Sequence, residues 1–450
     1  MQPGAGPPPS GAAGTTTATD AKWGRYGKRP LVVLCLVGLV DAIDRGILPA
    51  VIEPVQRELG FSDFQSGLLY TALIVAALLV AIPGGALADR SDRRSLMRGV
   101  LILWAAATTL AGLVQSYWQL LTVRAALGVG DALNDPAAQS LVADYYPPEI
   151  RGRAYAWQRV VPTVGVGLGT VIGGGLLALF GWRVAIIAVG VPGVLVALLV
   201  KRLPLPPRGE ADAVPVLAGA PLTTRQSVAA VLQVPSLRAL LLAVAFINGV
   251  LSALGFWGIA YHVRASGMSE SSAPAIAGSV ILFGAILGGI GGGIATDKLR
   301  GRFDGGLMLL AAIVTAVGTV LLFISFLDGI PVYGMRLPLQ LVGVALVVSS
   351  LPPITVIGAE VVPATLRGTS FGVTKLCANV LGAIFPPAIG LIADAHQITI
   401  STGAVKGDLG LAFRLTMGIV LIGSALLFYG RRHLDDDVRR ALEVTANASS

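Results

Sequence analysis

The chain is poor in charged residues, cysteine and histidine. Only 13% of its 450 residues are Asp, Glu, Lys or Arg, about half of the roughly 25% found in soluble domains. This deficit excludes an ordinary soluble globular protein, a disordered chain and a nucleic-acid binder. The two cysteines, Cys35 and Cys377, lie in apolar runs, so a disulfide framework is not expected. The three histidines are scattered and form no zinc pattern, and we expect no cofactor and no metal.

Hydrophobic residues make up 54% of the chain and gather in long runs. A helix needs about 20 mostly apolar residues to cross a bilayer. Twelve runs meet this requirement: 31–52, 67–88, 97–114, 118–142, 157–180, 183–200, 238–261, 274–296, 306–327, 338–360, 369–393 and 409–430. The fold class predicted from the sequence is therefore an all-α membrane protein with twelve transmembrane helices in two six-helix halves.

The basic residues predict how these spans are oriented. If the N-terminus is inside, most Lys and Arg outside the spans fall in inside segments, as the positive-inside rule requires. We therefore expect both termini in the cytoplasm, at a bacterial inner membrane. The predicted organisation is a disordered cytoplasmic tail (1–29), an N-terminal six-helix bundle (30–200), a cytoplasmic linker (201–237), a C-terminal six-helix bundle (238–430) and a cytoplasmic tail (431–450).

Loops of the two halves repeat the same patterns. The loops after the second and eighth spans match at Gly85, Asp89 and Arg90, and at Gly293, Asp297 and Lys298. The loops after the fourth and tenth spans match at Asp144, Pro147, Arg151 and Gly152, and at Glu360, Pro363, Arg367 and Gly368. Two matches in equivalent loops indicate a duplicated six-helix unit. Parallel repeats of this kind occur in transporters that rock one half against the other.

The repeat, the twelve spans and the loop sequence GALADRSDRR from Gly85 to Arg94 resemble the major facilitator superfamily. Asp92 departs from the family pattern, which usually has Gly there. The resemblance implies that Asp89 and Arg90 lock the cytoplasmic face by meeting helix ends, although the loop could serve as an orientation signal alone. The predicted cytoplasmic gate comprises Asp89, Arg90, Arg93, Asp144, Arg151, Asp297, Glu360 and Arg367.

Charged residues also lie inside two spans, where they are costly and usually functional. Asp41, Asp44 and Arg45 share one face of the first span, because residues three and four apart are neighbours on a helix. Arg124, Asp131 and Asp135 form a stripe on the fourth span, with Asp135 nearer one membrane face. We expect the stripes to face each other and assign proton coupling to Asp41, Asp44 and Asp131. A structural network of buried ion pairs is the alternative.

The stretches around these charges also resemble one branch of the superfamily. The stretch from Asp44 to Asp63 and the stretch from Arg124 to Asp131 are similar to the spinster-like branch of the superfamily, whose last acidic residue is usually Glu instead of Asp131. Members of that branch move lysophospholipids or sphingosine-type lipids and are linked to proton gradients. The resemblance thus implies a lipid-like amphiphile as substrate, with Arg45 and Arg124 at its headgroup.

The C-terminal half has few titratable groups and is expected to shape the cavity. The candidate substrate contacts there are Asn248, Trp257, Tyr261, Lys375 and Asn379. Lys375 could meet a phosphate or extend to the cytoplasmic edge, and the aromatic residues could equally be packing or interfacial residues. The glycines at 165, 169 and 173 allow close helix approach, which we expect at the moving seam between the halves.

The sequence therefore predicts a proton-coupled secondary transporter of lysophospholipid-like amphiphiles, acting by alternating access as a monomer among membrane lipids. A drug efflux pump or organic-anion carrier of the same superfamily is the alternative. An enzyme is not expected, because no nucleophile–base pair or metal cluster is visible. The sequence leaves open the exact substrate, import or export, symport or antiport, and which carboxylate carries the proton.

Overall fold

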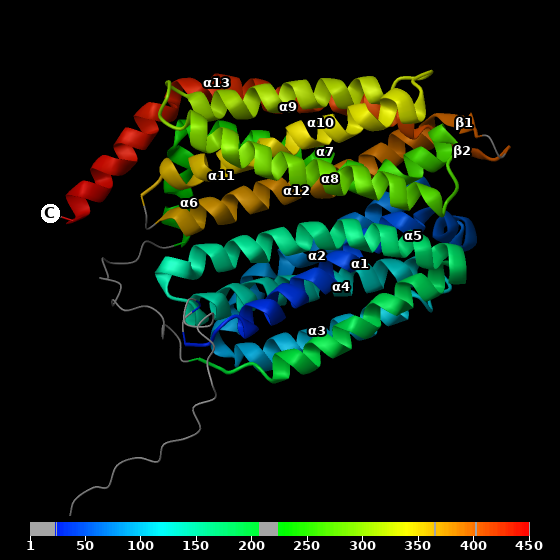
Figure 1. Cartoon of the computed structure of the whole chain (residues 1–450), viewed down its shortest axis with the longest axis horizontal. Coiled ribbons are helices and arrows are strands. Elements are labelled where there is room, and N and C mark those ends of the chain that lie inside the picture. Colours follow the sequence, from blue (N-terminus) through cyan, green and yellow to red (C-terminus); the bar gives the residue numbers. More distant parts are fainter. Residues whose placement is uncertain (1–22, 24, 207–223, 364–365, 401–402, 450) are drawn as a thin grey trace, which may run out of the picture.

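The computed structural model describes residues 23, 25–206, 224–363, 366–400 and 403–449. Long helices run side by side in two groups (Figure 1). The N-terminal half contains α1 (Arg29–Leu59), α2 (Asp63–Arg90), α3 (Arg93–Ala111), α4 (Tyr117–Tyr145) and α5 (Pro148–Lys201). The C-terminal half contains α7 (Pro235–Ser266), α8 (Ser272–Leu299), α9 (Gly306–Ser325), η2 (Val332–Arg336), α10 (Leu337–Ser349), α11 (Leu351–Glu360), α12 (Arg367–Ala395) and α13 (Leu409–Ser449).

Each of the twelve predicted spans is helical, which confirms the all-α membrane fold. The fifth and sixth spans are the two legs of α5, which turns at Gly181, where φ is 79°. Eight helical stretches of the described residues are long and apolar enough to cross a membrane by length and composition alone. Helices α1, α3 and α4 are not among them; α1 carries Asp41, Asp44 and Arg45 near its middle.

Short polar signals set several helix ends. Ser62 and Gln65 form a capping box at the start of α2, which satisfies backbone N–H groups that the helix leaves unpaired. Asp92 and Ser116 cap α3 and α4 with their side chains alone, which accept from the backbone N–H groups of Arg94 and Gln119. Gly60 ends α1 in a left-handed conformation, which a glycine adopts at little cost. With these caps, α4 begins within one residue of its predicted span, whereas α2 and α3 each begin four residues before theirs and α1 ends seven residues after its own.

The segments outside the predicted spans hold more structure than the sequence suggests. The predicted linker includes α6 (Thr224–Gln233), the predicted C-terminal tail continues α13, and an antiparallel hairpin of β1 (Gln397–Thr399) and β2 (Val405–Gly407) joins α12 to α13. The predicted disordered tail extends too far, because Trp23 packs edge-on against Tyr146 and the Tyr146 hydroxyl donates to the Gly27 carbonyl. Residues 1–22 and 207–223 of the predicted tail and linker lie outside the described residues.

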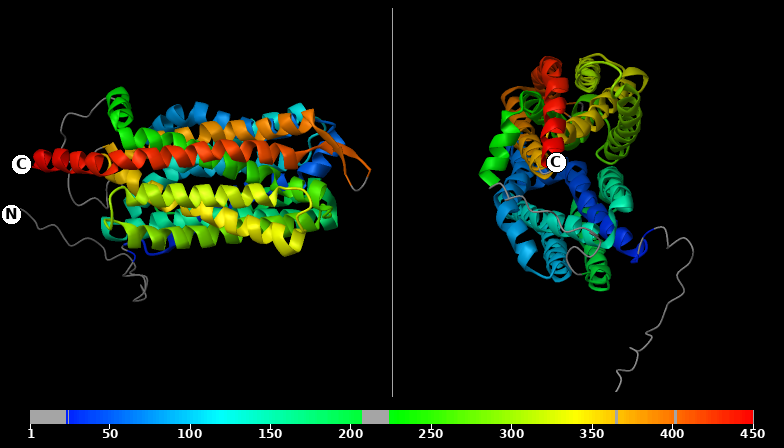
Figure 2. Two further views of the ribbon diagram at one scale, coloured as in Figure 1. Left: turned by 90° about the horizontal axis from the view of Figure 1, so that it is seen from above. Right: turned by 90° about the vertical axis from the view of Figure 1, so that its left-hand side faces the viewer.

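The molecule has two distinct ends, which we name the hairpin end and the linker end. The hairpin end carries β1 and β2, whereas the linker end carries α6 and the last turns of α13 (Figures 1 and 2). The view along the long axis shows the two helix groups facing each other (Figure 2). They meet where α2 packs on α12 and where α5 packs on α8.

Glycines allow close helix contacts in this fold, but the glycine repeat of α5 does not lie at the seam between the halves, where the sequence predicts it. A Cβ at Gly169 would lie 2.2 Å from the Ile43 carbonyl oxygen, and Gly165 and Gly173 also face α1. The glycine repeat of α5 therefore packs α1 within the N-terminal half, and its predicted place at the seam is wrong. At the seam, a Cβ at Gly67 of α2 would lie 2.4 Å from the Pro387 backbone of α12.

Candidate functional site

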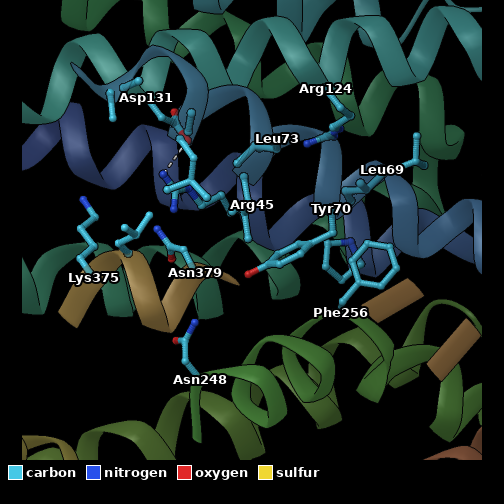
Figure 3. Close-up of a pocket in the computed structure, with 18 of the residues that line it drawn as sticks. Arg45, Leu69, Tyr70, Leu73, Arg124, Asp131, Asn248, Phe256, Lys375 and Asn379 are labelled. Atoms are coloured by element: carbon cyan, nitrogen blue, oxygen red, sulfur yellow. Dashed lines mark hydrogen bonds and ion pairs between the residues drawn. The ribbon is translucent and has the colours of Figure 1, made fainter. Parts of the chain in front are cut away.

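A cavity of about 590 Å³ lies between the two halves, near the middle of the helices. Its walls come from α1, α2 and α4 on one side and from α7 and α12 on the other (Figure 3). The cavity reaches toward the linker end, because Gly372 and Lys375 from the first turns of α12 line it. A site built from both halves changes shape whenever the halves move relative to each other.

Charged residues of α1 and α4 form the N-terminal wall. Arg45 pairs with Asp131 at 2.6 Å and with Asp41 at 3.0 Å, and Arg124 pairs with Asp44 at 3.3 Å. The two charged stripes therefore face each other as predicted. The pairs differ in exposure, since the Arg45 side chain is 44% exposed and that of Arg124 only 2%. The side chain of Asp135 lies outside the described residues.

Arg124 is buried beside the cavity with unused donors. Its Nη1 donates to Asp44, whereas Nε and Nη2 have no hydrogen-bond partner among the described residues. A buried donor without a partner costs about 1–3 kcal/mol, more when charged. Because Arg124 lines the cavity, an anionic or carbonyl oxygen of a bound molecule can satisfy these donors.

The C-terminal wall mixes polar and apolar side chains, and Lys375 is the basic group among its described lining residues. Asn248, Lys375 and Asn379 line the cavity from α7 and α12 (Figure 3). The Asn248 amide nitrogen also donates to the Ala378 carbonyl at 2.8 Å, which joins α7 to α12. This wall therefore supplies amide groups and one ammonium opposite the charged pairs of α1 and α4.

Two predicted substrate contacts lie outside the cavity lining, together with the predicted proton-coupling residues Asp41 and Asp44. Trp257 is fully buried, and its indole nitrogen donates to the Pro386 carbonyl at 2.8 Å. Tyr261 packs edge-on against Phe326 within the C-terminal half. Asp41 and Asp44 reach the site through their ion pairs with Arg45 and Arg124. The structure thus gathers five of the predicted substrate contacts and places the two aromatic residues in the core.

The apolar part of the cavity escaped the sequence analysis. Tyr70 and Phe256 meet across the halves with ring centroids 5.8 Å apart, and Leu69, Leu73 and Ile74 of α2 continue the apolar surface. Nothing distinguishes these residues in the sequence from any other apolar residue of a membrane span. Their place in the site follows only from how α2 packs against α7 and α12.

A buried charge network joins the halves at the hairpin end, and the sequence analysis missed it as well. Arg264 at the end of α7 donates to Glu53 at 2.6 Å and forms two bonds to Asp63, at 2.6 and 2.7 Å. Lys406 of β2 lies 3.4 Å from Glu53. Asp394 of α12 accepts hydrogen bonds from the first two backbone N–H groups of α2. These contacts close the hairpin end.

The predicted cytoplasmic gate residues lie at the linker end. Arg93 pairs with Asp144 within the N-terminal half, and Arg300 pairs with Glu360 within the C-terminal half. Arg151 donates to the Ala143 carbonyl at 2.8 Å.

The other predicted gate residues lie in the same duplicated loops. Arg367 donates to the Ala359 carbonyl at 3.1 Å, a contact with a helix end like that of Arg151. Asp297 is exposed, and the side chains of Asp89 and Arg90 lie outside the described residues. The duplicated loops therefore make equivalent contacts in each half.

Comparisons with known proteins agree with this architecture. Residues 34–386 match the family described as the Major Facilitator Superfamily. The chain is 28% identical to an MFS-type efflux pump of Mycolicibacterium smegmatis, over 93% of this chain and 95% of the relative. It is 26% identical to Protein spinster homolog 1 of Mus musculus, over 91% of this chain and 82% of the relative.

A solved structure shares the fold. It is a bacterial homolog to the human lysosomal transporter Spinster, in an inward-facing and unoccupied conformation. The superposition has a TM-score of 0.80 at 23% identity and covers 92% of this chain and 99% of that chain.

Proposed function

Because the chain belongs to the major facilitator superfamily and is a membrane transporter, we propose that it moves lysophospholipid-like amphiphiles by proton-coupled alternating access. Its relatives are transporters rather than enzymes. A small-molecule substrate and a membrane environment follow from the family. The choice of substrate and the coupling to protons are argued from the cavity below.

The observation that carries the proposal is that basic groups and an apolar surface line the same cavity. Arg45 and Arg124 present guanidinium groups from one half, and Lys375 presents an ammonium from the other. Leu69, Leu73 and other apolar side chains of α2 line the same space. Guanidinium groups bind phosphate oxygens through several parallel hydrogen bonds. A molecule with an anionic headgroup and an apolar chain matches both surfaces at once.

Proton coupling follows from competition for Arg45. Its guanidinium is shared between Asp41 and Asp131, so an arriving phosphate must compete with two carboxylates. Protonation of Asp131 removes one competitor and frees donors of Arg45 for the headgroup. Asp44 holds Arg124 in the same manner. We assign proton binding to Asp41, Asp44 and Asp131, and headgroup binding to Arg45, Arg124, Lys375, Asn248 and Asn379.

Alternating access requires the two ends to open in turn. The hairpin end is closed by Arg264 and its partners. We propose that the linker end faces the cytoplasm, with both termini there and the protein in a bacterial inner membrane, because the loops at that end are basic and basic loops favour the inside. The conformation is then closed to the outside. One chain supplies both halves and the whole cavity, so we propose that the monomer is the working unit.

The test is transport by purified protein in proteoliposomes. Uptake of a fluorescent lysophosphatidylethanolamine is measured with and without an imposed pH gradient, for the parent protein and for Asp44→Asn and Asp131→Asn. We expect each variant to lose gradient-driven uptake at least tenfold while its thermal unfolding stays cooperative. Asp436→Asn, on the exposed surface of α13, is the matched control. Undiminished gradient-driven uptake by both variants would show that these carboxylates do not couple transport to protons.

A drug efflux pump is the second candidate, favoured by the relative from Mycolicibacterium smegmatis, which aligns along almost the whole chain. The same arginines would hold the anionic group of a drug or another organic anion. Competition between lysophospholipid and a fluorescent drug in the proteoliposome assay separates the two. Drug transport that lysophospholipid does not inhibit would replace the first proposal with this one.

A further inference from the structure

A second cavity of about 400 Å³ lies in the N-terminal half, between the start of α1 and α5. Its lining runs along α1 from Lys28 to Leu36 and includes Trp157 and Val161 of α5. It shares no lining residue with the central cavity. We call this second cavity the α1–α5 groove.

The α1–α5 groove is apolar and open to the surroundings. Val32 and Trp157 in its lining are each 54% exposed. Just beyond Leu36 and Val161, α1 and α5 come into contact, since a Cβ at Gly38 would lie 3.1 Å from Pro162. The groove therefore ends at this contact, and its remaining length extends toward the linker end.

The depth of the groove matches one leaflet of a bilayer. Eight residues separate Lys28 from Leu36, and a helix rises 1.5 Å per residue, so the lined length is about 12 Å. One leaflet contributes about half of the roughly 30 Å hydrocarbon thickness. An acyl chain lying in the groove is thus buried along most of its length while its headgroup stays beside Lys28.

Positive charge marks the open end of the groove. The Lys28 ammonium lies 6.0 Å from the centre of the Trp23 ring. Arg25 and Arg29 beside it on the chain are exposed. Arg153 on α5 is also exposed, and it precedes Trp157 by four residues, so the two share a helix face. Basic groups at the end of a membrane span attract anionic headgroups, each contributing about 1 kcal/mol.

We propose that the α1–α5 groove is a binding site for an anionic membrane phospholipid, separate from the transport site. One acyl chain lies against Val32, Cys35 and Trp157, and the phosphate lies beside Lys28, with Arg25 and Arg153 near it. Charge complementarity selects the headgroup, and the apolar lining holds the chain. A flat basic surface would attract the same headgroup but would offer the chain no recess.

Native mass spectrometry of the purified, delipidated protein tests the site with two probes, phosphatidylglycerol and phosphatidylcholine of identical chains. We expect phosphatidylglycerol to bind at least fivefold more tightly. Lys28→Gln should weaken its binding about fivefold, and Trp157→Ala should weaken it several-fold. Arg238→Gln is the matched control, because Arg238 is an exposed basic residue near the start of α7, the first helix of the other half. A photoreactive phosphatidylglycerol should label the segments around Cys35 and Trp157.

Three outcomes would overturn the proposal. Equal losses for Lys28→Gln and Arg238→Gln would indicate attraction to surface charge alone. Equal binding of both lipids would show that Lys28 does not select the anionic headgroup. Displacement of phosphatidylglycerol by lysophosphatidylethanolamine from the segments around Cys35 and Trp157 would assign the groove to the transported substrate. Transport assays of the Asp44 and Asp131 variants decide the proposed function separately, so either proposal can fail without the other.

Discussion

The buried ion pairs at the hairpin end join the two halves, whereas the ion pairs at the linker end lie within a single half. At the hairpin end, Arg264 of the C-terminal half is 4% exposed and binds Glu53 and Asp63 of the N-terminal half. At the linker end, Arg93 and Asp144 pair within one half, and Arg300 and Glu360 pair within the other. Among the described residues, every ion pair between the halves lies at the hairpin end.

This difference shows which contacts can change while each half stays intact. An ion pair within a half moves with that half as a rigid unit, so rocking leaves it unchanged. A pair between halves must break when its end opens, and buried charges that lose their partner are costly. The hairpin-end network thus favours the conformation in which that end is closed. The variants below, in order of decreasing effect, test this contrast.

Arg264→Gln should have the largest effect. It removes the guanidinium that pairs with both Glu53 and Asp63 and leaves Glu53 with Lys406 alone. Breaking a buried pair costs about 3–5 kcal/mol, and the closed conformation bears this cost. We expect longer distances between spin labels placed on the two halves at the hairpin end, together with a lower unfolding temperature. Arg183→Gln is the control, because Arg183 pairs with Glu58 at the same end but within one half. Unchanged distances for Arg264→Gln would contradict the contrast.

Arg93→Gln should destabilise the protein without opening it. Asp144 is buried and loses its ion pair with the Arg93 guanidinium, so unfolding should become easier, by up to about 3–5 kcal/mol. The spin-label distances at the hairpin end should stay as in the parent. Arg300→Gln is the equivalent change in the other half. Its pair is exposed and should cost at most about 1 kcal/mol. A shift of the hairpin-end distances by either variant would argue against rigid halves.

Asp394→Ala should have a smaller effect with the same direction as Arg264→Gln. Asp394 caps α2 from the other half by accepting from the Asp63 and Phe64 N–H groups. A helix cap contributes about 1 kcal/mol, which corresponds to an approximately fivefold larger open population in the spin-label measurement. Ser62→Ala removes a cap of the same helix within its own half and should leave that population unchanged. Equal effects of both variants would mean that the cap stabilises α2 and not the closed end.

The smallest effect is expected from pH at the linker end. Hydrogen bonds from the Ser95 side chain and the Arg94 backbone hold the pKa of Asp92 below its ordinary value. The cap that Asp92 forms on α3 is therefore fully present above about pH 4, the ordinary aspartate pKa. It is lost as the pH falls through the lower pKa. Hydrogen exchange at the start of α3 should then increase, whereas Asp92→Asn should exchange without this pH dependence.

Several features of the site could be predicted from local sequence. Three- and four-residue spacings place Asp41, Asp44 and Arg45 on one face of α1, and the structure shows that face meeting Arg124 and Asp131. Such charges are conspicuous because membrane spans rarely contain them. The apolar residues of the cavity carry no such signal. Trp257 shows the opposite case: the sequence made it a candidate substrate contact, and the structure buries it fully in the core.

The amino-acid sequence by itself determined the helical membrane fold, the duplicated halves and the charges near the middle of α1 and α4. Hydrophobic length and helical periodicity are local properties and can be read along the chain. Only the tertiary structure decided that Arg264 meets Asp63, 201 positions away, and that α5 uses its glycines against α1. Those contacts depend on which helix faces pack together, and this choice is made by the shape and burial of the whole molecule.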